Sequence, residues 1–172
     1  MSSVVHANTP AHSHTKSSSR GRATPSKLVV FAANTADAVA AAGGLIYDSV
    51  RAGWHVDIYV ESAGDERALQ ILGVCGRVIP DAFDVEPLWP DAVYLDAEVY
   101  ERHRQVRRMV AESVRRQHAD IAVWQHDPQA KPAAGPGVEH RLSAAARAFK
   151  FHAMKAAGLT PQLAVVEPFR AR

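Results

Sequence analysis

The stretch LVVFAANTAD, residues 28–37, decides the fold of this chain because it joins a strand to a helix. Its first half is a short apolar run, which is typical of a strand covered on both faces. A helical stretch follows at residues 37–51 and ends at Gly53, which is a good helix stop. In parallel sheets, ligands bind where a strand turns into the next helix, so any functional site is expected in the turn at residues 33–37.

The rest of the chain alternates in the same way. Further strands are predicted where short apolar or β-branched runs recur, at residues 56–60, 77–79, 120–124 and 163–166. Helices are predicted between them, at residues 64–72, 97–117 and 138–157. Residues 80–96 hold three prolines with aromatic residues between them, which predicts a long loop. This alternation predicts an α/β fold, with a Rossmann-like, mostly parallel sheet and helices on both faces.

The composition predicts one domain, residues 27–172, preceded by a tail. The chain of 172 residues is 47% hydrophobic, which suffices for one core and not for two comfortable domains. Residues 1–26 are rich in Ser, Thr, His and Pro, and we expect a disordered basic tail there. No stretch has the apolar core of a signal peptide or a membrane span, so we expect a cytoplasmic protein without a membrane partner. The one cysteine, Cys75, excludes a disulfide framework or a cysteine-rich zinc site.

Charge is distributed unevenly along the chain. The net charge is +2, but the four cations up to Lys27 precede every acidic residue, so the remainder carries −2. We therefore expect nucleic acid to bind only through the basic tail. Arginines recur in the helix predicted at residues 97–117, where they could form a surface for an anionic partner or a solvated face. The solvated face is the simpler interpretation.

Two adjacent glycines, Gly43 and Gly44, lie inside the first predicted helix. Each costs about 1 kcal/mol relative to alanine in a helix interior, so the pair needs a structural reason. The usual reason is close approach of the helix backbone to the sheet. A phosphate-binding loop is the other candidate, but neither the Gly-x-Gly-x-x-Gly pattern nor a Walker lysine is present at the turn. The sequence thus argues against dinucleotide binding.

The register of this segment resembles that of the zinc-dependent de-N-acetylases of the PIG-L/LmbE type. In that family the motif Ala-His-Pro-Asp-Asp-Glu follows the first strand directly, and a Gly-Gly pair follows in the next helix. ANTADA, residues 33–38, stands in that place here, with the glycine pair at the matching distance. GVEH, residues 137–140, is similar to the family's later His-Pro-Asp-His motif, which opens a helix. The resemblance runs from about residue 27 to residue 158.

The resemblance implies a metal-dependent amide hydrolase fold. In the family, three protein ligands hold zinc, the metal lowers the pKa of water, and a carboxylate accepts the proton. Asp37 and His140 match two of the ligands, but Asn34 replaces the third and Ala36 replaces the base. Gly137 stands where the family has a histidine that stabilises the oxyanion. Alanine cannot accept a proton, so we expect the standard hydrolysis to be lost or severely impaired.

Two weaker arrangements stay open at this point. Zinc could still be held by Asp37 and His140 if Asn34 contributed its carbonyl oxygen or if His126 joined them. Asp127 or Glu139 would then be the substitute bases. If the turn has no function, its residues still have a structural explanation, because Asn34 is an ordinary N-cap and Asp37 is an ordinary residue for the first turn of a helix.

The predicted function is therefore that of a non-catalytic binding or regulatory protein with a degenerate zinc site. We expect no cofactor, and zinc is the one candidate. The partner of the chain would be another protein or a small sugar-like ligand. The alternative is a zinc-dependent de-N-acetylase with a rearranged site that acts on an N-acetylglucosamine-type substrate.

Overall fold

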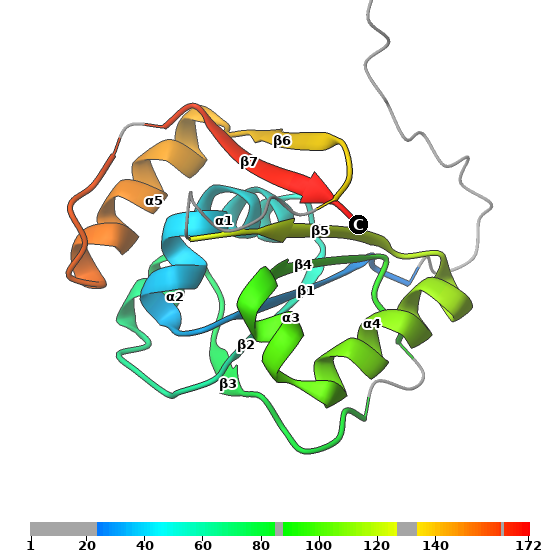
Figure 1. Cartoon of the computed structure of the whole chain (residues 1–172). Coiled ribbons are helices and arrows are strands. Elements are labelled where there is room, and N and C mark those ends of the chain that lie inside the picture. The colour runs from blue at the N-terminus through cyan, green and yellow to red at the C-terminus, as the bar shows by residue number, and fades with distance from the viewer. Residues whose placement is uncertain (1–23, 85–87, 127–133, 163) are drawn as a thin grey trace, which may run out of the picture.

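The computed structural model describes residues 24–84, 88–126, 134–162 and 164–172. Its strands form one seven-stranded sheet in the order β3-β2-β1-β4-β5-β7-β6 (Figure 1). In chain order the elements are β1 (Lys27–Ala32), α1 (Thr35–Arg51), β2 (His55–Val60), α2 (Arg67–Ile71), β3 (Gly76–Val78), β4 (Ala92–Asp96), α3 (Ala97–Arg102), α4 (Arg104–Gln117), β5 (Asp120–Trp124), β6 (Gly137–Arg141), α5 (Ala144–Ala156) and β7 (Val166–Ala171). The expected tail falls mostly in residues 1–23, which lie outside the described residues.

The sheet is mostly parallel, as the sequence predicts. Strands β1 to β5 pair in parallel, whereas β7 is antiparallel to both β5 and β6. In this register Phe31 lies opposite Leu95, and Asp96 lies opposite Trp124. The carboxyl ends of β1, β4 and β5 therefore meet at one edge of the sheet.

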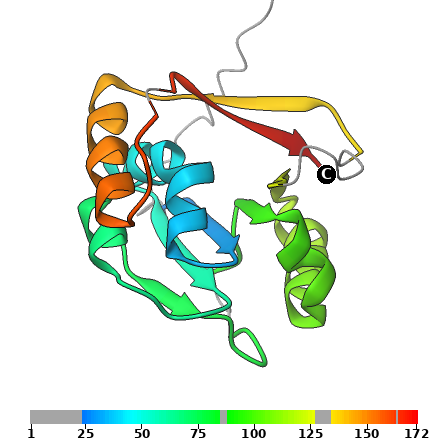
Figure 2. The same ribbon diagram turned by 60° about the vertical axis from the view of Figure 1, so that its left-hand side comes forward.

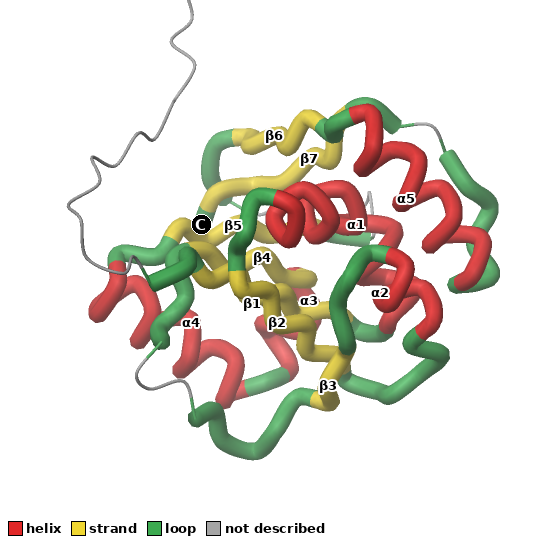
Figure 3. The backbone as a smooth tube through the Cα atoms, turned by 180° about the vertical axis from the view of Figure 1, so that it is seen from behind, coloured by secondary structure: helices red, strands yellow, loops and turns green. Residues whose placement is uncertain are grey.

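Helices cover both faces of the sheet (Figures 1 and 3). Alternate residues of β1 point to opposite faces, because successive side chains of a strand alternate. Leu28 and Val30 join one core cluster with α1, α2 and α5, whereas Val29 and Phe31 join a second cluster with α3 and α4. No helix among the described residues is long and apolar enough to cross a membrane.

The prediction of a long loop at residues 80–96 is wrong for its last part, because residues 92–96 form β4 in the middle of the sheet. Ala92, Val93 and Leu95 are buried between β1 and β5. Pro90 precedes the strand and so does not interrupt its hydrogen bonds. The run is short and follows a proline-rich stretch, and this context conceals it in the sequence.

The prediction of a helix at residues 138–157 is also wrong for its first part. Residues 137–141 form β6 at the edge of the sheet, and α5 begins only after Ser143, whose hydroxyl accepts a hydrogen bond from the Ala146 N–H (Figure 2). The cause is tertiary, because pairing with β7 holds this segment extended. The helix predicted at residues 97–117 is divided at His103, whose backbone is extended. The last strand, predicted at residues 163–166, instead spans Val166–Ala171.

The glycine pair in α1 has the close-packing role that the sequence suggests. A Cβ at Gly44 would collide with the Leu142 side chain and would lie 3.1 Å from Glu167 Oε1. A Cβ at Gly43 would lie 3.2 Å from Cγ of Lys150. The close approach of α1 to α5 and β7 therefore depends on the absence of side chains at both positions.

Candidate metal centre

The turn between β1 and α1 is built by helix capping. The Asn34 side chain accepts a hydrogen bond from the Asp37 N–H at 2.9 Å, which makes Asn34 the N-cap of α1. Asn34 is exposed, and its carbonyl oxygen is engaged in this cap. The turn thus fixes the backbone of Asp37 at the carboxyl end of β1.

Asp37 is held from several sides. Its Oδ2 accepts a hydrogen bond from the Ala33 N–H at 3.0 Å, and its Oδ1 accepts one from Trp124 Nε1 at 3.2 Å. Oδ1 also contacts His126 Nε2, while the side chain is only 5% exposed. Burial raises the pKa of Asp37 to about 6, although the Ala33 hydrogen bond and the nearby His126 oppose the shift.

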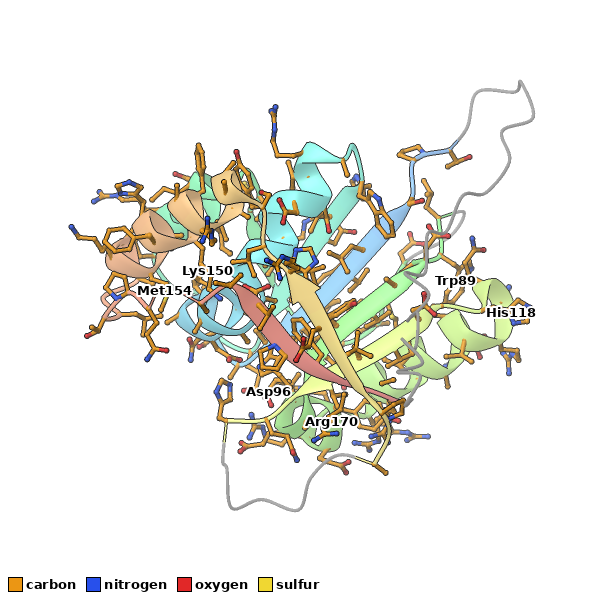
Figure 4. All side chains as sticks on the ribbon, turned by 90° about the horizontal axis from the view of Figure 1, so that it is seen from above. Trp89, Asp96, His118, Lys150, Met154 and Arg170 are labelled. Carbon is orange, nitrogen blue, oxygen red and sulfur yellow. The ribbon has the colours of Figure 1, made fainter. Side chains whose placement is uncertain are left out.

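Asp96 is the second buried carboxylate of this edge. It ends β4 and caps α3, because its Oδ1 accepts a hydrogen bond from the Glu98 N–H at 2.7 Å. Its side chain is 1% exposed, and its Oδ2 lies 3.3 Å from His126 Nε2. Figure 4 shows Asp96 among the side chains at this end of the sheet. Asp96 therefore faces the same imidazole as Asp37.

His126 completes the cluster from the segment after β5. Its side chain is about half exposed, so one side of the cluster is open to solvent. One ligand atom each from Asp37, Asp96 and His126 lies within 4.8 Å of the others. The cluster forms because β1, β4 and β5 are neighbours and parallel, so that the residues after their carboxyl ends meet.

The donor set fits a divalent cation. Zinc takes imidazole nitrogen and carboxylate oxygen, and three protein ligands with one open position are the usual arrangement of reactive zinc sites. The second oxygen of each carboxylate is bound by a backbone N–H, from Ala33 or Glu98, which orients the first oxygen toward His126. Manganese would also suit a set with two carboxylates. When bound, such an ion polarises a carbonyl or lowers the pKa of water.

The structure brings Asp37 and His126 together, but not Asp37 and His140. His140 lies on β6, where its Nε2 is 2.9 Å from Asp48 Oδ2. Asp48 is eleven residues after Asp37 in the same helix, or about 16 Å along its axis. The reason is the edge strand β6, which replaces the helix that the motif resemblance implied. Glu139 is exposed on the same strand, and Asp127 lies outside the described residues.

Asp48 and His140 belong to a cluster that ties α1 to the start of α5. Asp48 accepts hydrogen bonds from the Ser143 hydroxyl at 2.6 Å and from the Ser143 N–H at 3.1 Å. Burial alone would raise the pKa of Asp48, but the hydrogen bonds from Ser143 and His140 outweigh burial and hold this pKa below its usual value. These contacts give His140 a structural partner.

The sequence does not single out Asp96, because its proline-rich context predicts a loop where the structure has β4. A signal was nevertheless present, since Asp96 directly follows a short apolar run and precedes a helix, as Asp37 nearly does after β1. An acidic residue at such a junction caps the helix and also lies at the carboxyl edge of the sheet.

No protein-family model matches the chain, and no curated protein matches it. Among solved structures it is similar to a deacetylase triple mutant of the teicoplanin biosynthetic pathway, with a TM-score of 0.58, 14% identity and coverage of 85% of this chain and 97% of that one. It is similar to the zinc-inhibited form of teicoplanin deacetylase, with a TM-score of 0.51, 14% identity and coverage of 76% and 83%. It is also similar to the A40926 pseudoaglycone deacetylase, with a TM-score of 0.50, 16% identity and coverage of 76% of this chain and 80% of that one. The chain has the LmbE/PIG-L-like fold.

At these identities the likeness concerns the fold. The LmbE/PIG-L-like fold that the turn at residues 33–38 and the glycine pair predict is thereby confirmed. Within this fold, the described residues gather two carboxylates and one imidazole at the edge where the chain turns from β1 into α1.

Proposed function

We propose that this chain binds a divalent cation, zinc in the first place, at Asp37, Asp96 and His126, and uses it to hold a small polar ligand rather than to hydrolyse an amide rapidly. The observation that carries the proposal is the convergence of two buried carboxylates on one half-exposed imidazole. Two neighbouring anions buried without a cation are costly, and a divalent ion offsets that cost. The open side at His126 leaves a coordination position for an oxygen of the ligand.

The fold neighbours support zinc as the first ion to test, because one of them was crystallised in a zinc-inhibited form. The lack of rapid hydrolysis rests on Ala36. It occupies the position at which the resemblance expects the proton acceptor, and a methyl group cannot take up a proton. Asp37, Asp96 and His126 are all needed as ligands, so none of them is left to act as the base.

The test is a zinc titration of the metal-free protein by calorimetry, with native mass spectrometry for stoichiometry. Asp96→Asn keeps a side-chain oxygen for the α3 cap but removes the charge, so zinc binding should fall strongly while the fold is kept. His126→Ala should abolish the one-equivalent site. His140→Ala is the matched control, because His140 is also paired with a carboxylate but lies outside the cluster. Undiminished binding in Asp96→Asn and His126→Ala would refute the site.

Hydrolysis is the second candidate, and the open coordination position favours it. The assay measures release of free amine from N-acetylglucosamine conjugates by the zinc-loaded protein. We expect no turnover above the metal-free protein. In Ala36→Asp, which restores a carboxylate beside Asp37, slow zinc-dependent turnover is expected. Robust turnover of the unaltered chain that disappears in Asp96→Asn would instead establish a hydrolase with a rearranged site.

A further inference from the structure

A groove of about 700 Å³ lies along α4, and none of its lining residues belongs to the metal centre. One wall is α4, and residues 81–84 and Trp89 line the groove opposite it. Its volume is within the range of small-molecule sites, about 300–1,000 Å³. The groove is therefore large enough for a ligand of one or two rings.

The lining of the groove includes apolar side chains, and the core holds one of them, Phe83, in place. Phe83 packs edge-on against Phe31 and Tyr59, with ring centroids 5.5 and 5.2 Å apart. Met109 lies in the groove lining and is 3% exposed. Trp89, labelled in Figure 4, also lines the groove, beside Arg116 near the C-terminal end of α4. These side chains provide an apolar surface for a planar or alkyl group.

The α4 wall carries two arginines without a partner among the described residues. Arg104 and Arg108 are four residues apart, so they lie on the same face of the helix, and both line the groove. Other arginines of the α3–α4 region are engaged. Arg102 pairs with Glu61 and Glu98, whereas Arg107 donates to backbone carbonyls.

The acidic residues of the groove do not cancel these two cations. Both oxygens of Glu112 are bound, one by Arg115 and one by Arg116, whose guanidinium lies 5.0 Å from the centre of the Trp89 ring. Asp81 and Asp84 lie on the opposite wall. They can accept hydrogen bonds from hydroxyl groups or ammonium groups of a ligand.

We propose that this groove binds a small amphipathic anion, with a carboxylate, sulfonate or phosphate on Arg104 and Arg108 and an apolar body over Phe83 and Met109. Guanidinium groups bind such anions with paired, charge-assisted hydrogen bonds. The apolar side chains of the lining offer contacts to a ring or alkyl group, which a free inorganic anion cannot use. This site is independent of the proposed metal centre.

The test uses two fluorescent probes with similar rings, the anion 8-anilinonaphthalene-1-sulfonate and the neutral N-phenyl-1-naphthylamine. We expect saturable binding of the sulfonate, with a Kd about tenfold higher in Arg104→Gln/Arg108→Gln, as for the loss of hydrogen bonds to a charged group. The neutral probe should bind this variant and the unaltered protein about equally. Arg141→Gln, an exposed arginine on β6, is the matched control and should change neither Kd.

Three outcomes would overturn the proposal. The first is equal sulfonate binding by the arginine variant and the unaltered protein, since this would mean that the probe senses only apolar surface. The second is the absence of saturable binding while circular dichroism shows the protein folded. The third is a dimer in size-exclusion chromatography that the arginine variant loses, because the groove would then be an interface between copies of the chain.

Discussion

A buried ion pair between Lys150, labelled in Figure 4, and Glu167 joins α5 and β7 to the middle of α1. Its removal should lower the stability of the fold. Lys150 Nζ donates to Glu167 Oε1 at 2.6 Å and to the Ala40 carbonyl at 2.7 Å. Glu167 accepts from the N–H groups of Gly44 and Leu45 at 2.7 and 2.8 Å. Together, Lys150 and Glu167 therefore bind the backbone of α1 at residues 40, 44 and 45.

The losses of stability from removing the two partners should not add. The two side chains are 7% and 2% exposed, so Glu167→Gln leaves a buried ammonium without a counter-charge. Breaking such a pair costs about 3–5 kcal/mol, a large share of the typical stability of a domain. In Lys150→Met/Glu167→Gln neither side chain carries a charge. We expect the double variant to be less destabilised than the sum of the single variants by up to about 3 kcal/mol.

The assay is urea unfolding of the four proteins, followed by circular dichroism, with the free energy of unfolding from linear extrapolation. Glu98→Gln is the control, because Glu98 pairs with Arg102 at an exposed position and its loss should change stability little. Additive effects in the double variant would refute the idea that Lys150 and Glu167 act as one unit. Single variants as stable as the unaltered chain would refute the burial argument itself.

Three further predictions concern other parts of the molecule. Gly44→Ala should lower the thermal unfolding temperature, because its Cβ collides with Leu142 and overpacking costs about 1–3 kcal/mol; an increase, as helix propensity alone predicts, would contradict the packing. Folding lowers the pKa of Asp48, so this carboxylate stabilises the fold above its unfolded-state pKa, and the stabilisation is lost as the pH falls through its folded-state pKa. Asp48→Asn should therefore reduce the loss of unfolding free energy at acid pH. An unchanged loss at acid pH would count against the cluster of Asp48, His140 and Ser143. Protons compete with zinc for Asp37, so the zinc affinity measured by calorimetry should fall as the pH drops below about 6, and a constant affinity from pH 5 to pH 7.5 would argue against Asp37 as a ligand.

The parts of the fold that the sequence predicts well are those with strong local signals. β1, β2 and β5 are continuous or β-branched apolar runs, and α1 has a capping residue at its start and a glycine after its end. The elements that the sequence does not predict correctly depend on partners that are distant in the chain. β4 is short and follows three prolines, and β6 is held extended only by β7, which comes later in the chain. Local preference cannot supply such pairing.

In the metal centre, too, local signals identify some residues and distant pairing decides the others. Asp37 stands out in the sequence because it begins a helix directly after a buried strand, and His126 follows a second buried strand. Asp96 could not be added without β4, and only the strand order places β4 between β1 and β5. His140 matched a motif by its order along the chain, yet three-dimensional pairing gave it Asp48 instead.

The arrangement at the sheet edge separates metal binding from hydrolysis. Each carboxylate of the cluster has two roles, since one oxygen accepts a backbone N–H at the start of a helix and the other faces His126. The backbone N–H groups therefore hold these carboxylates in place whatever residue stands at position 36. Affinity for a cation and turnover of an amide thus depend on different residues under the proposed function. For this reason binding to the Asp96→Asn variant and turnover by the Ala36→Asp variant have to be measured separately.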